Sequence, residues 1–451
     1  MLNNRLEYIS KFPLLGQWET DNGERLYAAL SINRDNDLTF TLDAKTIELE
    51  NNKNFLNTKM YTLNNKDDDS VSIGWFGDVE HGVGVNHKAL YPDYAIAGYN
   101  FVEKGRYSFN TIDVYFTTSM WDVIDSKHKN GEIILKIEDS PKLEFETTKY
   151  KFSMGKVHSE KTMMSPLRYT LSGGALFVSV EKKDGSFTDV NEVLKVVIKL
   201  RNYFSMLNGS VVTIAGIEVR KSGSYESGQF IIPKLFSENI VEGYKQRGVG
   251  VSDFFKIASE TFETYYNQYF DNAGLIEGYY DYIVKSEEFG ELDTQISSLL
   301  QSIDMITQNF IEVQSAISTS ETHLKKSEYN KAIKEFEEVL STQSPSLKKF
   351  LKSAGKYYAN PSLGDRLRQL AQDLSPIIRT RYTGGDYPIL VGELRNDIMH
   401  GRGINYSKYN SAIIDYGSGL NALEGLVQGY LFRKFGLSEE LLRTMTNWAG
   451  R

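Results

Sequence analysis

Hydrophobic and polar residues alternate in short runs along the first half of the chain, which is the pattern of half-buried β-strands. Such runs occupy 16–49, 105–123 and 132–157, where Val, Ile, Thr, Tyr and Phe are separated by clusters of Asn, Asp and Gly. Segment 188–209 differs, because its apolar residues recur every three or four positions, as in one amphipathic helix. The run 210–219 is again strand-like, so the pattern predicts a β-rich N-terminal region.

The hydrophobic pattern becomes helical from about Ser252 onward. Apolar residues recur every three or four positions in four segments, which are 252–270, 291–318, 326–341 and 363–374. We therefore predict an α+β protein of two domains, with a β-rich region over 1–245 and an all-α helical bundle over 246–451. The aromatic residues of 252–270 have helical spacing, which indicates a core or dimer interface rather than a platform for bases.

Size and composition fit two soluble domains. The chain has 451 residues and a mass of 51.3 kDa, contains no cysteine and has no apolar run long enough to span a membrane. The first 16 residues also lack the pattern of a secretory signal. We expect a cytoplasmic protein without a membrane partner, because a chain without disulfides suits a reducing compartment.

Signatures of nucleotide hydrolysis, zinc proteases, serine hydrolases and calcium loops are missing from the sequence. The six histidines include no pair spaced to place two metal ligands on one helical face. We therefore expect neither a metal site nor a cofactor.

Charge is distributed unevenly along the chain. The net charge is −8, yet 324–408 holds fifteen Lys and Arg residues against nine Asp and Glu residues. A basic segment within an acidic protein is expected where one surface meets phosphate groups. A solvated helical face explains the same pattern, so charge alone leaves both interpretations open.

Segment 386–403, DYPILVGELRNDIMHGRG, has the features of one helix. Asp386 fits the N-cap position, and Gly401 fits a left-handed end. The spacing of Leu390, Leu394 and Ile398 predicts a buried stripe. The last two turns of this helix carry a group of polar residues that the stripe does not explain.

Arg395, Asn396 and His400 are placed by helical geometry so that they can converge on one ligand. Histidine gives and takes protons near neutrality, whereas the planar guanidinium of arginine offers paired donors to a phosphate. Asn396 suits the orientation of the imidazole or a bond to a phosphate oxygen. This set fits cleavage of RNA by its own 2′-hydroxyl without a metal.

Three other interpretations remain open at this stage. A histidine near a helix end is commonly a cap with no catalytic role. The same residues would also suit an RNA-binding module that does not cleave, in which Arg395 and His400 only hold phosphate. A third possibility is a protein-interaction scaffold, in which the β region binds a partner and the helices dimerise.

The motif RNDIMH, followed by Gly401, resembles the RxxxxH signature of the HEPN superfamily. HEPN domains are small helical bundles, and many are metal-independent ribonucleases. The order of a β region starting at FPLLGQWETDNGERLYAALSI, the helix EVLKVVIKLRNYFSMLNG and a helical part is similar to that of ApeA-type anti-phage abortive-infection proteins. The resemblance implies a HEPN bundle in 246–451 and an endoribonuclease whose RNA substrate is tRNA.

The resemblance also implies partners and further site residues. HEPN sites are shared between two copies, so it implies a homodimer or higher homo-oligomer, with a phage-derived trigger or inhibitor protein as a further partner. An acidic residue, usually glutamate, is common in an earlier helix of the family, and Asp304 in LLQSIDMI holds that position here. Composition alone favours a solvated helix charge for Asp304. Arg402, Arg379 and Arg381 are candidate RNA contacts, because they lie in or beside the basic segment.

Overall fold

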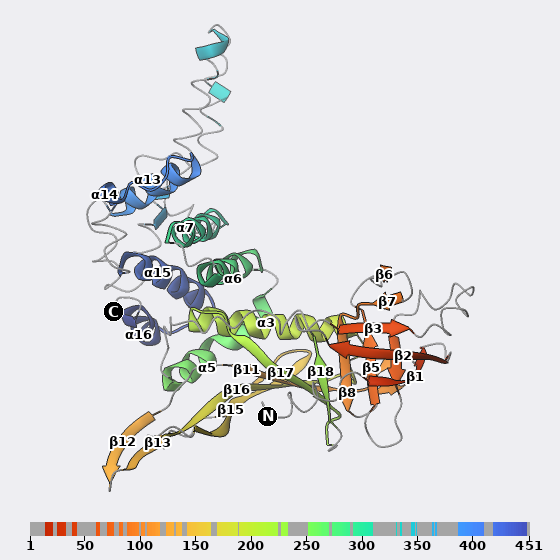
Figure 1. Ribbon diagram of the computed structural model, residues 1–451. Coiled ribbons are helices and arrows are strands. Elements are labelled where there is room, and N and C mark those ends of the chain that lie inside the picture. Colours follow the sequence, from red (N-terminus) through yellow and green to blue (C-terminus); the bar gives the residue numbers. More distant parts are fainter. Residues whose placement is uncertain are drawn as a thin grey trace. The chain divides into compact units, whose positions relative to one another are not determined.

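The computed structural model describes the chain in segments (Figure 1). The described residues are 14–20, 25–32, 38–42, 60–63, 70–75, 81–83, 88–98, 101–103, 106–117, 123–129, 132–137, 142–163, 169–187, 189–223, 227–232, 251–269, 273–288, 292–309, 331, 334–335, 344–347, 349, 363–364, 366–367, 387–409 and 418–448. The chain divides into two compact units: unit 1 is Met1–Phe204 with Val212–Phe255, and unit 2 is Ser205–Val211 with Lys256–Arg451. The predicted boundary at 245/246 lies outside the described residues and stays a prediction.

An antiparallel β-sheet dominates unit 1. In the described residues it has 14 strands in the order β14-β15-β16-β11-β17-β18-β8-β5-β4-β1-β2-β3-β7-β6. Its strands are β1 (Leu14–Thr20), β2 (Arg25–Ile32), β3 (Leu38–Leu42), β4 (Met60–Leu63), β5 (Ser70–Gly74), β6 (His81–Val83), β7 (Lys88–Leu90), β8 (Tyr94–Gly98), β11 (Thr111–Thr117), β14 (Leu143–Glu146), β15 (Tyr150–Met163), β16 (Tyr169–Lys182), β17 (Thr213–Arg220) and β18 (Ser227–Ile231). Two-stranded sheets are formed by β9 (Val102–Glu103) with β10 (Arg106–Tyr107) and by β12 (Val123–Lys129) with β13 (Glu132–Ile137).

Alternation of side chains explains why the N-terminal strands form a sheet with one buried face. In β1, Trp18 is buried, whereas Leu15 and Gln17 are exposed, and β2 alternates in the same way. The indole of Trp18 donates a hydrogen bond to the carbonyl oxygen of Ala28 at 3.2 Å and contacts Phe40 edge to face. The core of these strands contains Trp18, Leu26, Ala28, Leu30, Phe40, Val71, Ile73, Trp75, Leu90, Ala95 and Ala97.

A second core lies between the central strands and helix α3 (Val190–Asn208). Figure 1 shows α3 along the face of β11, β17 and β18. The ring of Phe204 on α3 lies 5.1 Å from that of Phe116 on β11, and both rings are fully buried. The amphipathic helix that the sequence predicts over 188–209 is confirmed by α3.

The predicted fold class is wrong. The described residues form a β-rich structure with a large antiparallel sheet and limited helical content, and they do not form an all-α HEPN bundle. Periodicity of three to four residues predicts that a helix forms, but not how several helices assemble. The described helices of unit 2 pack mainly in pairs, α6 with α7 and α15 with α16.

After residue 250, the helices whose bounds the described residues give are α5 (Val251–Gln268), α6 (Ala273–Glu288), α7 (Leu292–Asn309), α13 (Tyr387–Met399), α14 (Tyr406–Tyr409), α15 (Ser418–Lys434) and α16 (Glu439–Trp448). Helices α6 and α7 are joined by Ser302, whose hydroxyl donates to the carbonyl oxygen of Gly278 at 2.9 Å. The aromatic side chains of α5 lie in the core, as predicted; the Tyr265 ring is fully buried and meets Phe435 edge to face. Among the helices in the described part of the chain, none combines the length and apolarity of a membrane span.

Candidate functional site

Helix α13 ends in a hydrogen-bonded turn that fixes the direction of the chain after His400. The φ angle of Gly401 is 66°, which confirms the predicted left-handed end. The backbone N–H of Gly401 donates to the carbonyl oxygen of Ile398 at 3.0 Å, and that of Arg402 donates to Asp397 at 2.8 Å. This is the Schellman arrangement, in which the last carbonyl groups of a helix are satisfied by the turn that follows.

The buried face of α13 differs from the predicted stripe. Leu394 is fully buried, as expected, but its fully buried neighbour is Val391, whereas Leu390 and Ile398 are only partly buried. Residues three apart share a helical face, so Val391 and Leu394 define the side that packs inward. The prediction failed because a step of four residues and a step of three residues fit the sequence equally well.

Helix α13 also lies close to a segment of which 363–364 and 366–367 are described. A Cβ atom added at Gly392 would lie 3.5 Å from the backbone nitrogen of Gly364, which is ordinary van der Waals contact. Leu363 and Leu367 in the same segment are buried. The segment therefore holds Arg366 beside α13.

Asp304 on α7 binds two guanidinium groups. Nη2 of Arg395 donates to Oδ2 of Asp304 at 2.7 Å, and Nη2 of Arg366 donates to Oδ1 at 2.6 Å. The Asp304 side chain is 13% exposed, and that of Arg366 is 10% exposed. The interpretation of Asp304 as a solvated charge on a helix surface, which composition favoured, is therefore wrong. The structure brings Asp304 together with Arg395.

The two guanidinium groups keep Asp304 ionised. Burial raises the pKa of this carboxyl, but the hydrogen bond and charge of Arg366, followed by those of Arg395, outweigh burial and lower the pKa below its ordinary value. One carboxylate then binds two guanidinium groups. The Arg395 side chain is 31% exposed, so its guanidinium is accessible to an anionic ligand.

Asn396 and His400 lie on the exposed side of α13. Oδ1 of Asn396 accepts a hydrogen bond from Nη1 of Arg395 at 3.3 Å, so these two predicted residues are in contact. The backbone N–H of His400 donates to the carbonyl oxygen of Asn396, while the imidazole is exposed. Among the described residues, no side chain hydrogen-bonds to this imidazole, which is open to a ligand.

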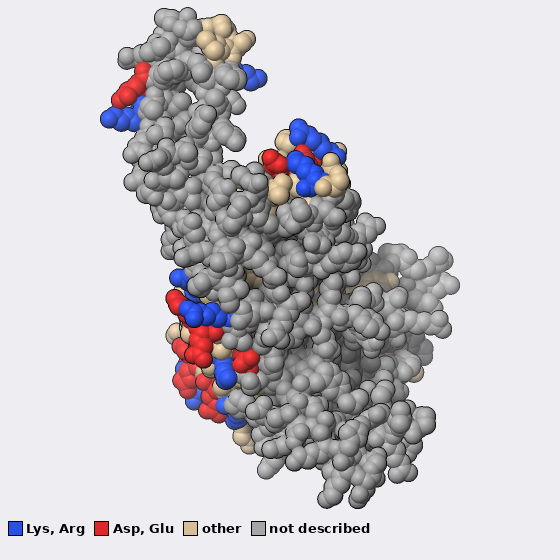
Figure 2. All heavy atoms as spheres, turned by 90° about the vertical axis from the view of Figure 1, so that its left-hand side faces the viewer, with Lys and Arg blue, Asp and Glu red and all other residues tan. Residues whose placement is uncertain are grey.

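The other candidate RNA contacts are placed less completely. Arg402 is 67% exposed, and its guanidinium donates to Oδ1 of Asp397 at 3.2 Å. Arg379 and Arg381 lie outside the described residues. Figure 2 shows acidic and basic side chains beside one another on the described parts of one face. The role of the basic segment as an RNA-facing surface therefore stays a prediction.

Three residues of the site, Arg366, Asp397 and Tyr409, were not predicted from the sequence. Arg366 lies in the basic segment, but its spacing gives no sign that it shares a carboxylate with Arg395. Tyr409 is fully buried and its hydroxyl donates to Asp397 at 2.5 Å, across a turn that no helical pattern relates. These contacts depend on tertiary structure, which the local pattern does not specify.

Within the described segments, no group of three or more His, Cys, Asp or Glu residues is arranged to hold a metal ion. Comparisons with family models, with curated proteins and with solved structures give no match for this chain.

Proposed function

We propose that this protein is an endoribonuclease that cleaves RNA through attack by the neighbouring 2′-hydroxyl, without a metal. His400 transfers the proton, and Arg395 binds the phosphate that develops charge during the reaction. The observation that carries this proposal is the pairing of Arg395 with the largely buried side chain of Asp304, on a helix whose last turn carries an exposed His400. The likeness of RNDIMH to the HEPN signature supports it as a motif, although the fold is not the predicted all-α bundle.

The fixed position of Arg395 favours catalysis over loose phosphate binding. Asp304 engages one nitrogen of the guanidinium, while Arg366 occupies the second carboxylate oxygen. Donors that are already held in place cost little reorganisation when charge develops on a substrate. The guanidinium N–H groups of Arg395 that bond neither Asp304 nor Asn396 can therefore contact a phosphate without breaking the pair with Asp304.

A second copy of the chain would complete the chemistry. Cleavage by a 2′-hydroxyl requires a base and an acid, and the described part of one copy supplies one histidine at this site. Met399, adjacent to His400, is 53% exposed, and an exposed apolar side chain next to a site suits a contact between copies. A homodimer or higher homo-oligomer that joins two copies of α13 would provide both roles.

The substrate and setting follow from the resemblance rather than from the geometry. The likeness to ApeA-type proteins supports tRNA as the substrate and a role in an anti-phage abortive-infection system. A cytoplasmic location suits both, as does the absence of cysteine. In this setting a phage-derived trigger or inhibitor protein would bind the β-rich part.

A cleavage assay with and without chelator tests the proposal. We expect purified wild-type protein to cleave RNA at the same rate in excess EDTA, because the residues named need no metal. Binding that weakens with salt but leaves the RNA intact would instead show a non-catalytic RNA-binding module. A protein that neither binds nor cleaves RNA would favour the interaction scaffold.

A further inference from the structure

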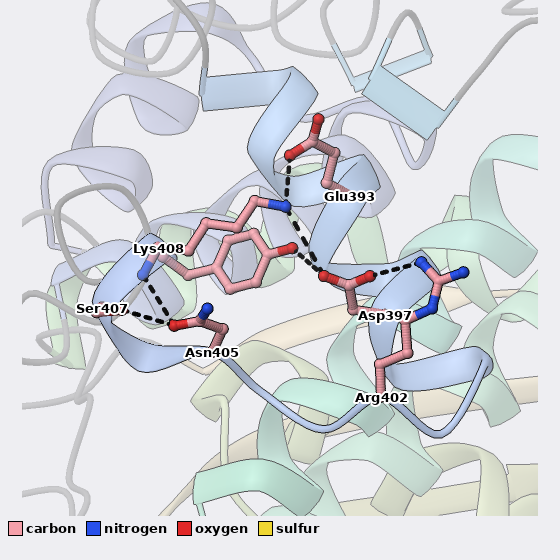
Figure 3. A network of polar contacts seen from close by, with 7 residues as sticks. Glu393, Asp397, Arg402, Asn405, Ser407 and Lys408 are labelled. Atoms are coloured by element: carbon pink, nitrogen blue, oxygen red, sulfur yellow. Dashed lines mark hydrogen bonds and ion pairs between the residues drawn. The ribbon is translucent and has the colours of Figure 1, made fainter.

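Charged side chains of α13 and of the residues that follow it form a network centred on Asp397 (Figure 3). The Tyr409 hydroxyl donates to Oδ2 of Asp397 at 2.5 Å, and Nη1 of Arg402 donates to Oδ1 at 3.2 Å. The ammonium group of Lys408 lies 3.0 Å from Oε2 of Glu393 and 3.8 Å from Oδ2 of Asp397. We call these five residues the Tyr409 cluster.

The cluster joins α13 to α14 across a turn whose own contacts do little to hold it in one conformation. The turn contains Gly401 and Gly403, both with positive φ, and glycine loses much conformational freedom when it is ordered. Helix α14 (Tyr406–Tyr409) has four residues, too few for a helix to be stable in isolation. Asn405 caps it, since its side-chain oxygen accepts a hydrogen bond from the N–H of Lys408 at 3.3 Å. Contacts with α13 therefore hold the turn in one conformation.

Within the cluster, the buried hydroxyl of Tyr409 is paired with the carboxylate of Asp397. Tyr409 is fully buried, so its hydroxyl needs a partner, and Asp397 supplies one. The hydrogen bond from Tyr409, followed by the donors of Arg402 and the charge of Lys408, lowers the pKa of Asp397 below its ordinary value. Asp397 is thus ionised and bound to the turn through both its carboxylate and its backbone carbonyl.

The cluster also keeps a carboxylate away from the candidate catalytic histidine. Asp397 precedes His400 by three residues, a spacing at which two side chains of a helix can pair. In the structure, Oδ1 of Asp397 is occupied by Arg402, and Oδ2 is occupied by Tyr409 and approached by Lys408. The carboxylate of Asp397 is therefore bound by residues that follow α13. The side chain of His400 stays available to a ligand.

We propose that Asp397 and Tyr409 are positioning residues, which hold the 400–405 turn so that His400 and Arg402 face the RNA together. This inference rests on the proposed ribonuclease function and adds residues that do not touch the substrate. The two arginines of this region are held by different carboxylates. Arg395 is bound by Asp304, and Arg402 is bound by Asp397.

The test is Tyr409→Phe in the full-length protein, because this change removes one hydroxyl and keeps the buried ring. We expect kcat for RNA cleavage to fall about tenfold, since a charge-assisted hydrogen bond is lost. KM should change less than kcat, because Arg395 and its partners are intact and only the contact of Arg402 with RNA is loosened. In hydrogen–deuterium exchange, peptides covering 400–405 should exchange faster than in the wild type, while those of α6 and α7 should not change.

Tyr265→Phe is the matched control, because Tyr265 is a fully buried tyrosine of unit 2. It belongs neither to the Tyr409 cluster nor to the candidate site around Asp304 and Arg395. It should leave kcat and the exchange of 400–405 unchanged. Asp397→Asn provides a second variant, which should also lower kcat and speed exchange in the turn. Unchanged kcat in both variants, or unchanged exchange of the turn, would overturn the inference. A wild-type protein that cleaves no RNA would refute the proposed function, whereas faster exchange in Tyr409→Phe would still show that the cluster holds the turn.

Discussion

Replacing His400 by alanine is expected to lower the rate of RNA cleavage by between about 10² and 10⁴ fold. The affinity for RNA should change little, because Arg395, Arg366 and Asp304 keep their contacts. The side chain of His400 is exposed, so the substitution should leave thermal unfolding near that of the wild type. Single-turnover cleavage and filter binding on the same preparation measure the two quantities.

Added imidazole distinguishes proton transfer from a structural role of His400. If the ring acts as acid or base, free imidazole should restore part of the activity of His400→Ala and leave the wild type unaffected. A His400→Ala protein that cleaves at the wild-type rate would remove His400 from the mechanism. Loss of RNA binding in this variant would instead indicate that the residue only holds the substrate.

Replacing Asp304 by alanine is expected to destabilise unit 2 and to impair cleavage together. The change removes the carboxylate that both Arg366 and Arg395 bind. Breaking a largely buried ion pair in this way costs about 3 kcal/mol of the free energy of unfolding. Denaturant unfolding measures this loss, and RNA cleavage below the unfolding transition measures the loss of a positioned Arg395.

A surface pair provides the control for Asp304. On α16, Nη2 of Arg443 lies 3.7 Å from Oε2 of Glu439, and both side chains are exposed. Glu439→Ala should therefore lower the free energy of unfolding by less than about 1 kcal/mol. Equal effects of the two substitutions would show that the buried pair has no special role. An Asp304→Ala protein with normal stability and cleavage would contradict the account of the site.

The ion pairs of Asp304 make the stability of the protein fall at acidic pH. The folded-state pKa of Asp304 is lowered, so its contribution is present above the pKa of the unfolded chain and is lost as pH falls through the folded value. The loss lies below the ordinary aspartate range of about pH 4. Asp304→Asn should therefore reduce the difference in stability between neutral and strongly acidic pH.

Single elements of the fold could be predicted from the sequence, whereas their assembly could not. Alternation of buried and exposed residues identified the strands around Trp18, and helical periodicity identified α3 and α5. The fold class was wrong, because the pairing of strands distant in sequence and the pairing of α6 with α7 depend on tertiary packing. Local patterns carry little information about either.

The candidate site shows the same limit. The spacing of Arg395 and His400 in one helix was visible in the sequence, and so was the glycine that ends the helix. Arg366 and Tyr409 could not be found in this way, because their partners lie across a turn or on another helix. Polar residues whose role depends on a buried partner require the three-dimensional arrangement.

The chemical ends of the RNA fragments test the central claim most directly. If wild-type protein acts through the 2′-hydroxyl, the upstream fragment should carry a 2′,3′-cyclic phosphate or the phosphate formed by its opening, and the downstream fragment a 5′-hydroxyl. One 2′-deoxy nucleotide at the cleaved position should abolish cleavage there. Products with a 3′-hydroxyl and a 5′-phosphate would contradict the account, because they indicate water activated by a metal ion.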